Sequence, residues 1–458
     1  RWTKDAKALA LKVSDADLEA WIGELPFSLT NDQQTALAQI RVDLARRVPM
    51  SRLLEGDVGS GKTIVAALAA RIAVAAGAQA ALMAPTELLA EQHHRSLSGV
   101  FGTSGPRVAL LTSSVTGAAR QQTLDALEKG TLDVVVGTHA LVEESVAFKR
   151  LALAVVDEQH RFGVRQRATF REKGIDPHLL LTTATPIPQT LSQTVYRDLD
   201  ISALHEHPSG RQQIRTEVRT ADALPKVWPW LRGRVALGEQ AFVVTPRIDE
   251  DPEDDIASAE ATYRDLVAKD LKGLRIALLH GRMPAKDRDK VMLKFAAGDL
   301  DVLVATTVIE VGIDIPKATV MVILGAERFG LAQLHQLRGR VGRRGQKAFA
   351  VLVSEAAGES ERLAAMTERD PKTGEPLDGF ELAKRDLEIR GAGEFLGKEQ
   401  SGESELRIVD LADADPALID ETAIEADGML AKDPQLERPE HAAIAAAVEE
   451  LWRRYALA

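Results

Sequence analysis

The stretch Gly56-Asp57-Val58-Gly59-Ser60-Gly61-Lys62-Thr63 fits the pattern G-x-x-x-x-G-K-[ST] of a phosphate-binding loop. Residues 53–54, both leucine, lead into it like a short buried strand, and residues 64–76 contain no Pro or Gly and favour helix. Glycines let backbone N–H groups point at phosphate oxygens, and the helix N-terminus adds positive potential. We therefore expect Lys62 to bind the β- and γ-phosphates and Thr63 to bind Mg²⁺. A chance glycine-rich turn and a nucleotide site without turnover are the alternatives.

The composition is that of a soluble globular protein, with 45% hydrophobic and 27% charged residues among 458. There are no cysteines, which excludes disulfides, iron–sulfur clusters and thiolate zinc sites. The ten histidines form no HExxH pair, so a transition metal held by the protein is not expected. The net charge of −11 argues against a uniformly basic nucleic-acid surface but allows a local basic groove. The apolar run Val65–Pro85 is interrupted by Arg71, and it indicates a buried helix and strand better than a membrane span.

Apolar strand candidates alternate with helical stretches after the loop. The expected strands are Gln79–Ala84, Val108–Thr112, Asp133–Gly137, Leu151–Asp157 and Leu179–Thr183, and the expected helices are Glu87–Leu97 and Ala118–Glu128. Continuous apolar strands indicate a parallel sheet that is covered by helices on both faces. Ligands of such α/β sheets bind at the carboxyl ends of the strands.

A pair of carboxylates ends one of these strands. We expect Asp157 to hold Mg²⁺ and Glu158 to orient and deprotonate the attacking water. Two solvated acids are the alternative, which the upstream phosphate loop makes weaker. Thr183 and Thr185 end another strand, and their small hydroxyls are candidates to couple the acids to movement of a neighbouring lobe.

A second half begins near His205, in a stretch expected to be an exposed loop. Its expected strands are Gln240–Val244, Leu274–His280, Asp301–Ala305, Thr319–Leu324 and Phe349–Val353. The acidic run Asp249–Asp255 is expected to be a solvated loop. The pattern predicts a second parallel sheet without a phosphate loop.

Arginines are concentrated in the stretch QLRGRVGRR at residues 336–344. Two arginines three apart on a helical turn face the same way, so Arg340 and Arg343 are candidate arginine fingers for a γ-phosphate held on the first sheet. A basic surface patch is the alternative, and it suits Arg338 and Arg344 better.

The last hundred residues have a different pattern. Glu361–Glu368 and Gly379–Arg390 are expected helices joined by a turn at Pro371–Asp378, which makes a helical hairpin followed by a loop to Gly402. The second helix has an expected apolar face at Phe380, Ala383 and Leu387.

The motifs in this order resemble a superfamily 2 helicase motor. They are LTNDQ (29–33), GDVGSGKT (56–63), APTELLAEQH (84–93), VGTHAL (136–141), VVDEQH (155–160), TTATPIPQTL (182–191), VATTVIEVGIDIP (304–316) and QLRGRVGR (336–343). The DEQH box followed by RFGVRQR (161–167), and the segment Gly379–Gly402, are similar to the RecG family of bacterial branched-DNA helicases. The resemblance runs from about Pro26 to the C-terminus.

The resemblance implies a monomeric, ATP-driven translocase on duplex DNA, of the 3'-5' helicase class. Such an enzyme reverses stalled forks and migrates Holliday junctions in DNA recombination and in the repair of DNA damage. It implies ATP and Mg²⁺ as cofactors, branched and double-stranded DNA and single-stranded DNA-binding protein as partners, and a place at the bacterial nucleoid in the cytoplasm, without a membrane. Because the chain starts at Arg1, we also expect a fragment that lacks the family's N-terminal wedge domain.

The resemblance also assigns roles to individual residues. The implied catalytic residues are Glu158, Asp157, Gln336, Arg340 and Arg343. The implied ATP-binding residues are Phe27, Gln33, Gly56, Gly59, Ser60, Gly61, Lys62 and Thr63, with Gln33 reading adenine. Mg²⁺ is implied at Thr63 and Asp157, DNA at Thr86, Thr138 and His139, and coupling of ATP to movement at Thr183, Thr185, Arg390 and Gln400.

The expected architecture is α/β, with two RecA-like parallel-sheet lobes and a C-terminal helical hairpin region. The expected segments are 1–25 (linking helix), 26–205 (ATP-binding lobe), 206–355 (second lobe) and 356–458 (translocation hairpin, loop and C-terminal helices). Gln189 stands where the family usually has Arg, which puts that contact in doubt. Two alternatives remain: an Mfd-like duplex translocase, which the stretch 388–393 resembles equally, and an ATP-switched DNA-binding module without net translocation.

Overall fold

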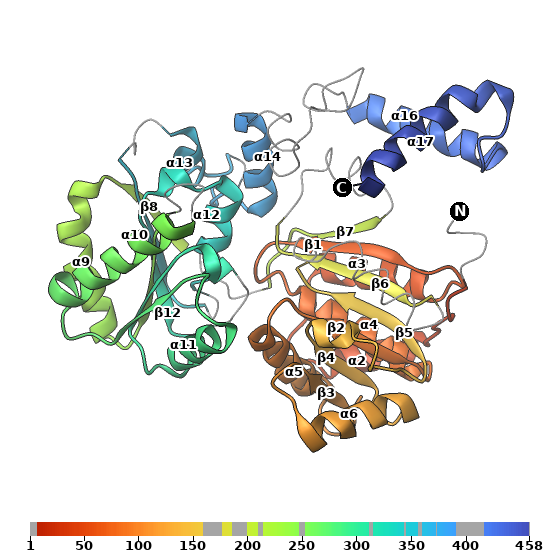
Figure 1. Cartoon of the computed structure of the whole chain (residues 1–458), viewed down its shortest axis with the longest axis horizontal. Helices are drawn as coiled ribbons and strands as arrows, with labels where there is room; N and C mark the ends of the chain where they lie inside the picture. The colour runs from red at the N-terminus through yellow and green to blue at the C-terminus, as the bar shows by residue number, and fades with distance from the viewer. Residues whose placement is uncertain are drawn as a thin grey trace. The chain divides into compact units, whose positions relative to one another are not determined.

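The computed structural model describes most of the chain (Figure 1). The described residues are 7–158, 176–185, 199–208, 214–246, 252–310, 315–342, 345–355, 360–371, 373–390 and 416–457. Among these residues, no helix is both long and apolar enough to cross a bilayer.

The first lobe is built on a seven-stranded parallel sheet with the strand order β3-β4-β2-β5-β6-β1-β7. Its strands are β1 (Ser51–Gly56), β2 (Gln79–Met83), β3 (Val108–Leu111), β4 (Val134–Gly137), β5 (Leu151–Val156), β6 (His178–Thr183) and β7 (Asp200–Leu204). Its helices are α2 (Asp15–Gly23), α3 (Asn31–Leu44), α4 (Lys62–Ala75), α5 (Glu87–Phe101) and α6 (Gly117–Lys129), with a 3₁₀ turn η1 (His139–Val142).

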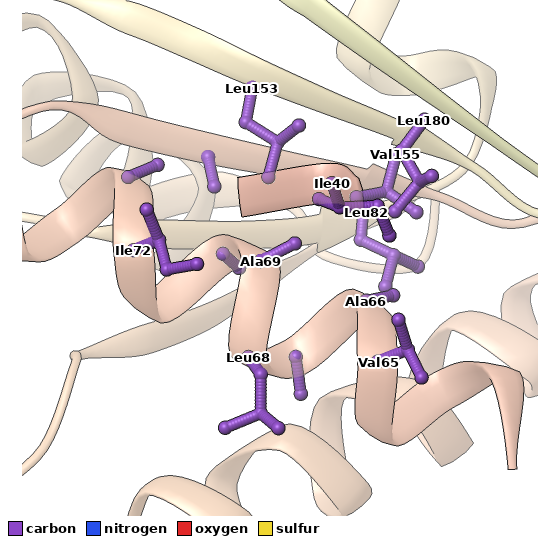
Figure 2. Close-up of a cluster of buried hydrophobic side chains, with 14 of the residues drawn as sticks. Ile40, Val65, Ala66, Leu68, Ala69, Ile72, Leu82, Leu153, Val155 and Leu180 are labelled. Atoms are coloured by element: carbon purple, nitrogen blue, oxygen red, sulfur yellow. The ribbon is translucent and has the colours of Figure 1, made fainter. Parts of the chain in front are cut away.

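Helix α4 forms the centre of the first lobe's core. It packs against α3, α5 and strands β1, β2 and β5, so side chains on all sides of it are buried. Val65, Leu68 and Ile72 of α4 lie in the same apolar cluster as Leu82 of β2 and Leu153 of β5 (Figure 2). A helix that is apolar all round is stable only in such an enclosed position. This burial fixes the position of α4 and therefore of its N-terminus at Lys62.

The second lobe is built on a six-stranded parallel sheet with the strand order β10-β11-β9-β12-β13-β8. Its strands are β8 (Ile214–Arg219), β9 (Gln240–Val244), β10 (Ile276–Leu279), β11 (Val302–Ala305), β12 (Ala318–Ile323) and β13 (Ala348–Val353). Its helical segments are η3 (Ala221–Ala223), α9 (Leu224–Ala236), α10 (Pro252–Asp265), η4 (Leu266–Asp270), α11 (Ala285–Ala297), η5 (Thr307–Glu310), η6 (Ala326–Arg328) and α12 (Leu331–Arg338).

Both faces of this second sheet are buried, which explains its unbroken apolar strands. On β9, Ala241 and Val243 join one core cluster, and Phe242 and Val244 join another. Successive side chains of a strand point to opposite faces, so a strand covered on both sides is apolar at every position.

The two lobes repeat the same polar contacts at matching places. Gln79, the first residue of β2, donates from Nε2 to the carbonyls of Leu127 and Leu132, both at 2.9 Å. Gln240, the first residue of β9, donates in the same way to Phe295 and Leu300, at 2.6 and 2.7 Å.

A second repeated contact joins adjacent strands. The backbone N–H and guanidinium of Arg107 donate to Asp133 in the first lobe, and those of Arg275 donate to Asp301 in the second. Both pairs are 26 residues apart in sequence. The lobes are therefore two versions of one scaffold.

The C-terminal region contains α13 (Glu361–Ala365), α14 (Gly379–Arg390), α16 (Pro416–Lys432), a 3₁₀ turn η7 (Pro439–His441) and α17 (Ala442–Leu457). Leu363 of α13 and Leu382 of α14 belong to a core cluster of the second lobe. Between α16 and α17, Asp433 accepts hydrogen bonds from the backbone of Arg438 at 2.9 Å and from the ring of His441 at 2.8 Å.

The two-lobed α/β architecture is confirmed, with several differences at the level of elements. Two edge strands, β7 and β8, were not predicted, because both are only partly buried and polar residues interrupt their apolar ones. The expected loop at Asp249–Asp255 is wrong at its end: α10 begins at Pro252, and Pro at the first turn followed by acidic residues stabilises a helix start. The expected helix Glu361–Glu368 ends at Ala365.

Helix α14 has the predicted bounds but a different buried face. Leu382, Ala383 and Asp386 are buried, whereas Phe380 and Leu387 are only half-buried. The face is therefore rotated from the expected one. The segment boundaries proposed at 26, 206 and 356 stay a prediction.

Candidate functional site

The phosphate-binding loop lies between β1 and α4, as predicted. Gly59 and Gly61 have φ of 84° and 85°, a left-handed conformation that glycine adopts without strain. Gly61 is the N-cap of α4 and supplies no side-chain hydrogen bond, so the first N–H groups of the helix are available to an anion. Among the residues that the structure describes, the buried hydroxyl of Ser60 has no hydrogen-bond partner. These features fit the phosphate chain of a nucleotide.

Lys62 lies deep in this loop. Its ammonium donates to the carbonyls of Gly56 at 2.6 Å and Asp57 at 3.0 Å. Burial lowers the pKa of Lys62, against the nearby carboxylates of Glu158 and Asp157, which raise it. The positive charge is therefore held where phosphate oxygens of a ligand would stabilise it further.

Asp157 follows directly after β5, and its carboxylate is held from two sides. His93 of α5 places Nε2 at 2.7 Å from Oδ2, and the hydroxyl of Thr182 on β6 donates to Oδ1. Burial raises the pKa of Asp157, but His93, Thr182 and Lys62 together lower it to about 2. The group is therefore a carboxylate at neutral pH, as a Mg²⁺ ligand must be.

Glu158 has a φ of 56°, in the left-handed region that non-glycine residues seldom adopt. Such backbone strain costs of order 1–3 kcal/mol and concentrates at functional sites. The turn places Glu158 and Asp157 on the lining of one cavity. This position fits the predicted general base.

The cavity has a volume of about 220 Å³, and its lining combines most of the predicted catalytic groups. Thr63 and Asp157, the two candidate Mg²⁺ ligands, line it together with Lys62 and Glu158. Arg340 of the second lobe lines it as well and is buried. Its charge acts on Lys62 to lower the pKa of that lysine. The donor set therefore fits a magnesium–nucleotide complex.

Arg340 does not lie on a helix, contrary to the expectation of a helical turn. Helix α12 ends at Arg338, Gly339 is its C-cap, and Arg340 follows in the turn. Glycine eases the close packing at this position, since a Cβ on Gly339 would lie 3.1 Å from Cβ of Val58. The close approach brings Arg340 to the phosphate loop.

Two buried residues of α12 make polar contacts that sequence reasoning missed. His335 places Nε2 at 2.6 Å from Oδ1 of Asp57, and its Nδ1 lies 2.9 Å from Nη2 of Arg338. Arg338 also donates to the carbonyls of Met366 and Leu377, at 3.3 and 3.2 Å. The surface-patch alternative for Arg338 is thus wrong, because the side chain is only 7% exposed.

The predicted adenine-binding residues lie at the start of α3. Gln33 completes a capping box with Thr30, and its Nε2 donates to the carbonyl of Ser60 at 2.7 Å. The amide thereby links α3 to the phosphate loop. Phe27 is half-exposed just upstream.

The predicted DNA-facing residues follow the ends of β2 and β4. Thr86 is the N-cap of α5 and accepts from the backbone of Leu89 at 3.3 Å. Thr138 is buried at the start of η1, whereas His139 is exposed. Only Thr86 and His139 therefore present accessible surface of any size.

Two of the predicted coupling residues, Thr185 and Arg390, lie beside or on α14. The hydroxyls of Thr183 and Thr185 are 2.8 Å apart. Thr185, Gln336 and residues 379, 382 and 383 of α14 line a small cavity of about 10 Å³. Gln336, which the resemblance implied to be catalytic, thus lines this small cavity together with Thr185 and is not among the residues that line the cavity of about 220 Å³. Arg390 is the last residue of α14.

Some predictions fall outside the described residues. They concern Gln189, Arg343, Arg344 and Gln400, the stretch 161–167 and the expected loop at 391–402.

Three family models match the chain. The DEAD/DEAH box helicase model matches residues 30–194, and the helicase conserved C-terminal domain matches residues 224–345. The model "ATP-dependent DNA helicase RecG, domain 3, C-terminal" matches residues 376–456, which decides between the RecG and Mfd resemblances of the C-terminal region.

Similar proteins agree with these models. The chain is 43% identical to the ATP-dependent DNA helicase RecG of Bacillus subtilis (strain 168) over 445 residues, which covers 96% of this chain and 64% of the relative. It is 45% identical to the RecG of Streptococcus pneumoniae serotype 4 over 419 residues, covering 91% of this chain and 60% of the relative.

A solved structure of RecG bound to a three-way DNA junction is also similar. Its TM-score is 0.75 at 42% identity, covering 88% of this chain and 52% of that one. The chain thus spans between half and two thirds of the length of these three proteins. The glycine loop, the paired acids, Arg340 and these likenesses together lead to one conclusion: the chain belongs to the RecG helicase family.

Proposed function

We propose that this chain is the ATP-hydrolysing motor of a double-stranded DNA translocase that remodels branched DNA, with roles in fork reversal and Holliday junction migration. The observation that carries the proposal is the cavity lined by Lys62, Asp157, Glu158 and Arg340. It combines a phosphate-binding cation, a metal-binding carboxylate, a base and an arginine, which are the parts that phosphoryl transfer to water requires.

In the proposed reaction, Lys62 and the N–H groups of the loop bind the phosphates, and Thr63 and Asp157 hold Mg²⁺. Mg²⁺ held by these two residues would neutralise negative charge that develops on the phosphate oxygens. Glu158 orients the attacking water and accepts its proton. Arg340, with Arg343 as a second candidate, donates to the transferred phosphoryl group. Gln33 and Phe27 hold the adenine.

DNA is proposed to contact Thr86 and His139 of the first lobe, with Thr138 shaping the turn that presents His139. Thr183, Thr185 and Gln336 are proposed to transmit lobe movement to α14, with Arg390 and Gln400 completing the translocation element. The buried contacts of Arg338 with Met366 and Leu377 support this route, because they tie α12 to the segment that precedes α14.

Further proposals follow from family membership. The motor acts as a monomer of the 3'-5' class at the bacterial nucleoid, binds single-stranded DNA-binding protein, and has lobes at 26–205 and 206–355 with a C-terminal region at 356–458.

Steady-state ATP hydrolysis tests the proposal, measured without DNA, with linear duplex and with a three-way junction. We expect stimulation by both DNAs and more by the junction. An ATP-switched binding module would instead bind DNA in an ATP-dependent way without turnover. Parent protein that shows no hydrolysis with any of these DNAs would overturn the proposal.

A further inference from the structure

The carboxylate of Asp157 has a partner that the proposed nucleotide chemistry does not use. His93 is 7% exposed and lies with Nε2 at 2.7 Å from Oδ2 of Asp157. The two residues are 64 positions apart, so the contact is a product of the fold. An imidazole so deeply buried against a metal-binding carboxylate requires an explanation.

The same segment of chain holds Asp157 at two points. The backbone N–H of Asp157 donates to the carbonyl of Met83, the last residue of β2, at 2.9 Å. Helix α5 then begins at Glu87 and carries His93 on its second turn. The unit from Met83 to His93 therefore fixes both the backbone and the side chain of Asp157.

The hydrogen bonds define how the carboxylate is oriented. An ionised carboxylate only accepts hydrogen bonds, so Nε2 of His93 carries the proton in this contact. Thr182 donates to the other oxygen, Oδ1. A carboxylate offers about four lone-pair positions. Each oxygen thus keeps capacity for a metal ion or its water, while its rotation is blocked.

We propose that His93 is a positioning residue for the magnesium site, which orients the Asp157 carboxylate toward Mg²⁺ and ties it to α5. The proposal rests on the proposed role of Asp157 as a Mg²⁺ ligand. Carboxylates that bind metals are commonly held by such outer partners, whose loss typically costs about 10–100-fold in metal affinity. Helix α5 also has Thr86 as its N-cap, so a residue proposed to face DNA and the partner of the metal ligand belong to one helix.

The alternative is that His93 only fills space in the core. Two substitutions separate these roles. In His93→Gln the amide nitrogen is as many bonds from Cβ as Nε2 is in histidine, so it can still donate to Asp157. In His93→Asn the amide nitrogen is one bond closer to Cβ and cannot reach the carboxylate of Asp157. Both variants are polar and differ by a single methylene. His94→Asn, on the next position of the same helix and half-buried, is the matched control.

The measurement is metal affinity, independent of turnover. The protein is saturated with ADP, Mn²⁺ is titrated in place of Mg²⁺, and free Mn²⁺ is quantified by EPR. In a separate measurement, the affinity for ADP alone is determined in EDTA with a fluorescent analogue. We expect His93→Asn to weaken Mn²⁺ about 10–100-fold with unchanged ADP affinity in EDTA. His93→Gln should stay close to the parent, and His94→Asn should match it.

Two results would overturn the proposal: parent-like Mn²⁺ affinity in His93→Asn, or equal losses in the Gln and Asn variants while both retain the parent's melting temperature. If His93→Asn does not fold, a loss in folded His93→Gln as large as that of Asp157→Asn would also count against it. Because Mn²⁺ and ADP binding are measured without DNA or hydrolysis, failure of the proposed translocase activity leaves this test intact.

Discussion

Lys62 and Glu158 line one cavity but act at different stages of the proposed cycle. Lys62→Ala removes the cation that faces the phosphates, so we expect ATP binding itself to weaken. Glu158→Gln keeps the shape of the side chain and its ability to hydrogen-bond to water, but glutamine cannot act as a base. We therefore expect near-parent ATP affinity and a loss of turnover of about 10²–10⁴-fold. Fluorescent-nucleotide binding and steady-state ATPase assays distinguish the two. Turnover by Glu158→Gln near the parent rate would show that another group is the base.

Arg340 is expected to act mainly in the transition state. Its guanidinium meets charge that develops on the transferred phosphoryl group, so Arg340→Ala should lower kcat far more than ATP affinity. Arginine fingers of GTPases contribute about 10³–10⁵-fold in rate, and we expect a smaller but large effect here. Arg340→Lys keeps the positive charge but not the planar guanidinium, so we expect it to restore little of the lost kcat. Equal losses of affinity and rate would indicate a ground-state phosphate contact.

At the scale of elements, the repeated Arg–Asp contacts give a pH dependence of stability. Hydrogen bonds from Arg275 lower the pKa of Asp301. Burial acts to raise the pKa of Asp133, but the hydrogen bonds from Arg107 outweigh the effect of burial, and the pKa of Asp133 lies below its ordinary value of 3.8. A carboxylate with a lowered pKa contributes stability that is complete above its unfolded pKa and lost as the pH falls through the folded value. We therefore expect Asp133→Asn and Asp301→Asn each to destabilise by about 1 kcal/mol at pH 7.

Urea unfolding at pH 7 and pH 3 checks this expectation. The variants should lose less stability between the two pH values than the parent. Since the two contacts lie in separate sheets, their effects should add. The same dependence on pH in parent and double variant would show that these aspartates do not contribute to it.

The sequence predicted a strand or helix well where burial makes its pattern of apolar residues regular. Strand β9 was predicted to the residue, because a strand buried on both faces is uniformly apolar. Strands β7 and β8 were missed, because edge strands keep polar residues that resemble loops. The helix expected around Arg340 was wrong, since Gly339 ends α12.

For the site, motifs predicted residues that line the cavity of about 220 Å³ but not the residues that hold them in place. His93 and His335 lie 64 and 278 positions from the aspartates that they contact, and no local pattern signals such pairs. The adjacent histidines in the APTELLAEQHH stretch were the only visible sign of His93.

At the scale of the whole motor, Arg390 ends the helix that is proposed to convert lobe closure into movement on DNA. We expect Arg390→Ala to keep its fold and most DNA-stimulated ATPase activity, while displacement of a triplex strand falls about tenfold or more. Lys384→Ala, exposed on the same helix, should leave both activities unchanged. A parallel fall of ATPase, displacement and melting temperature would mean that α14 only supports packing.

The duplicated scaffold also has a consequence for stoichiometry. In the second lobe, β8 and α9 occupy the places that β1 and α4 occupy in the first, judged by strand order. Where the first lobe has its glycine loop, the second has only Thr220 and the short 3₁₀ turn Ala221–Ala223, without glycine or lysine. Among the described residues, one lobe of the two therefore carries a glycine loop that could bind a nucleotide. Calorimetric titration should give one ATP analogue per chain and a clearly weaker affinity for Lys62→Ala, which would limit the proposed motor to one ATP per opening and closing.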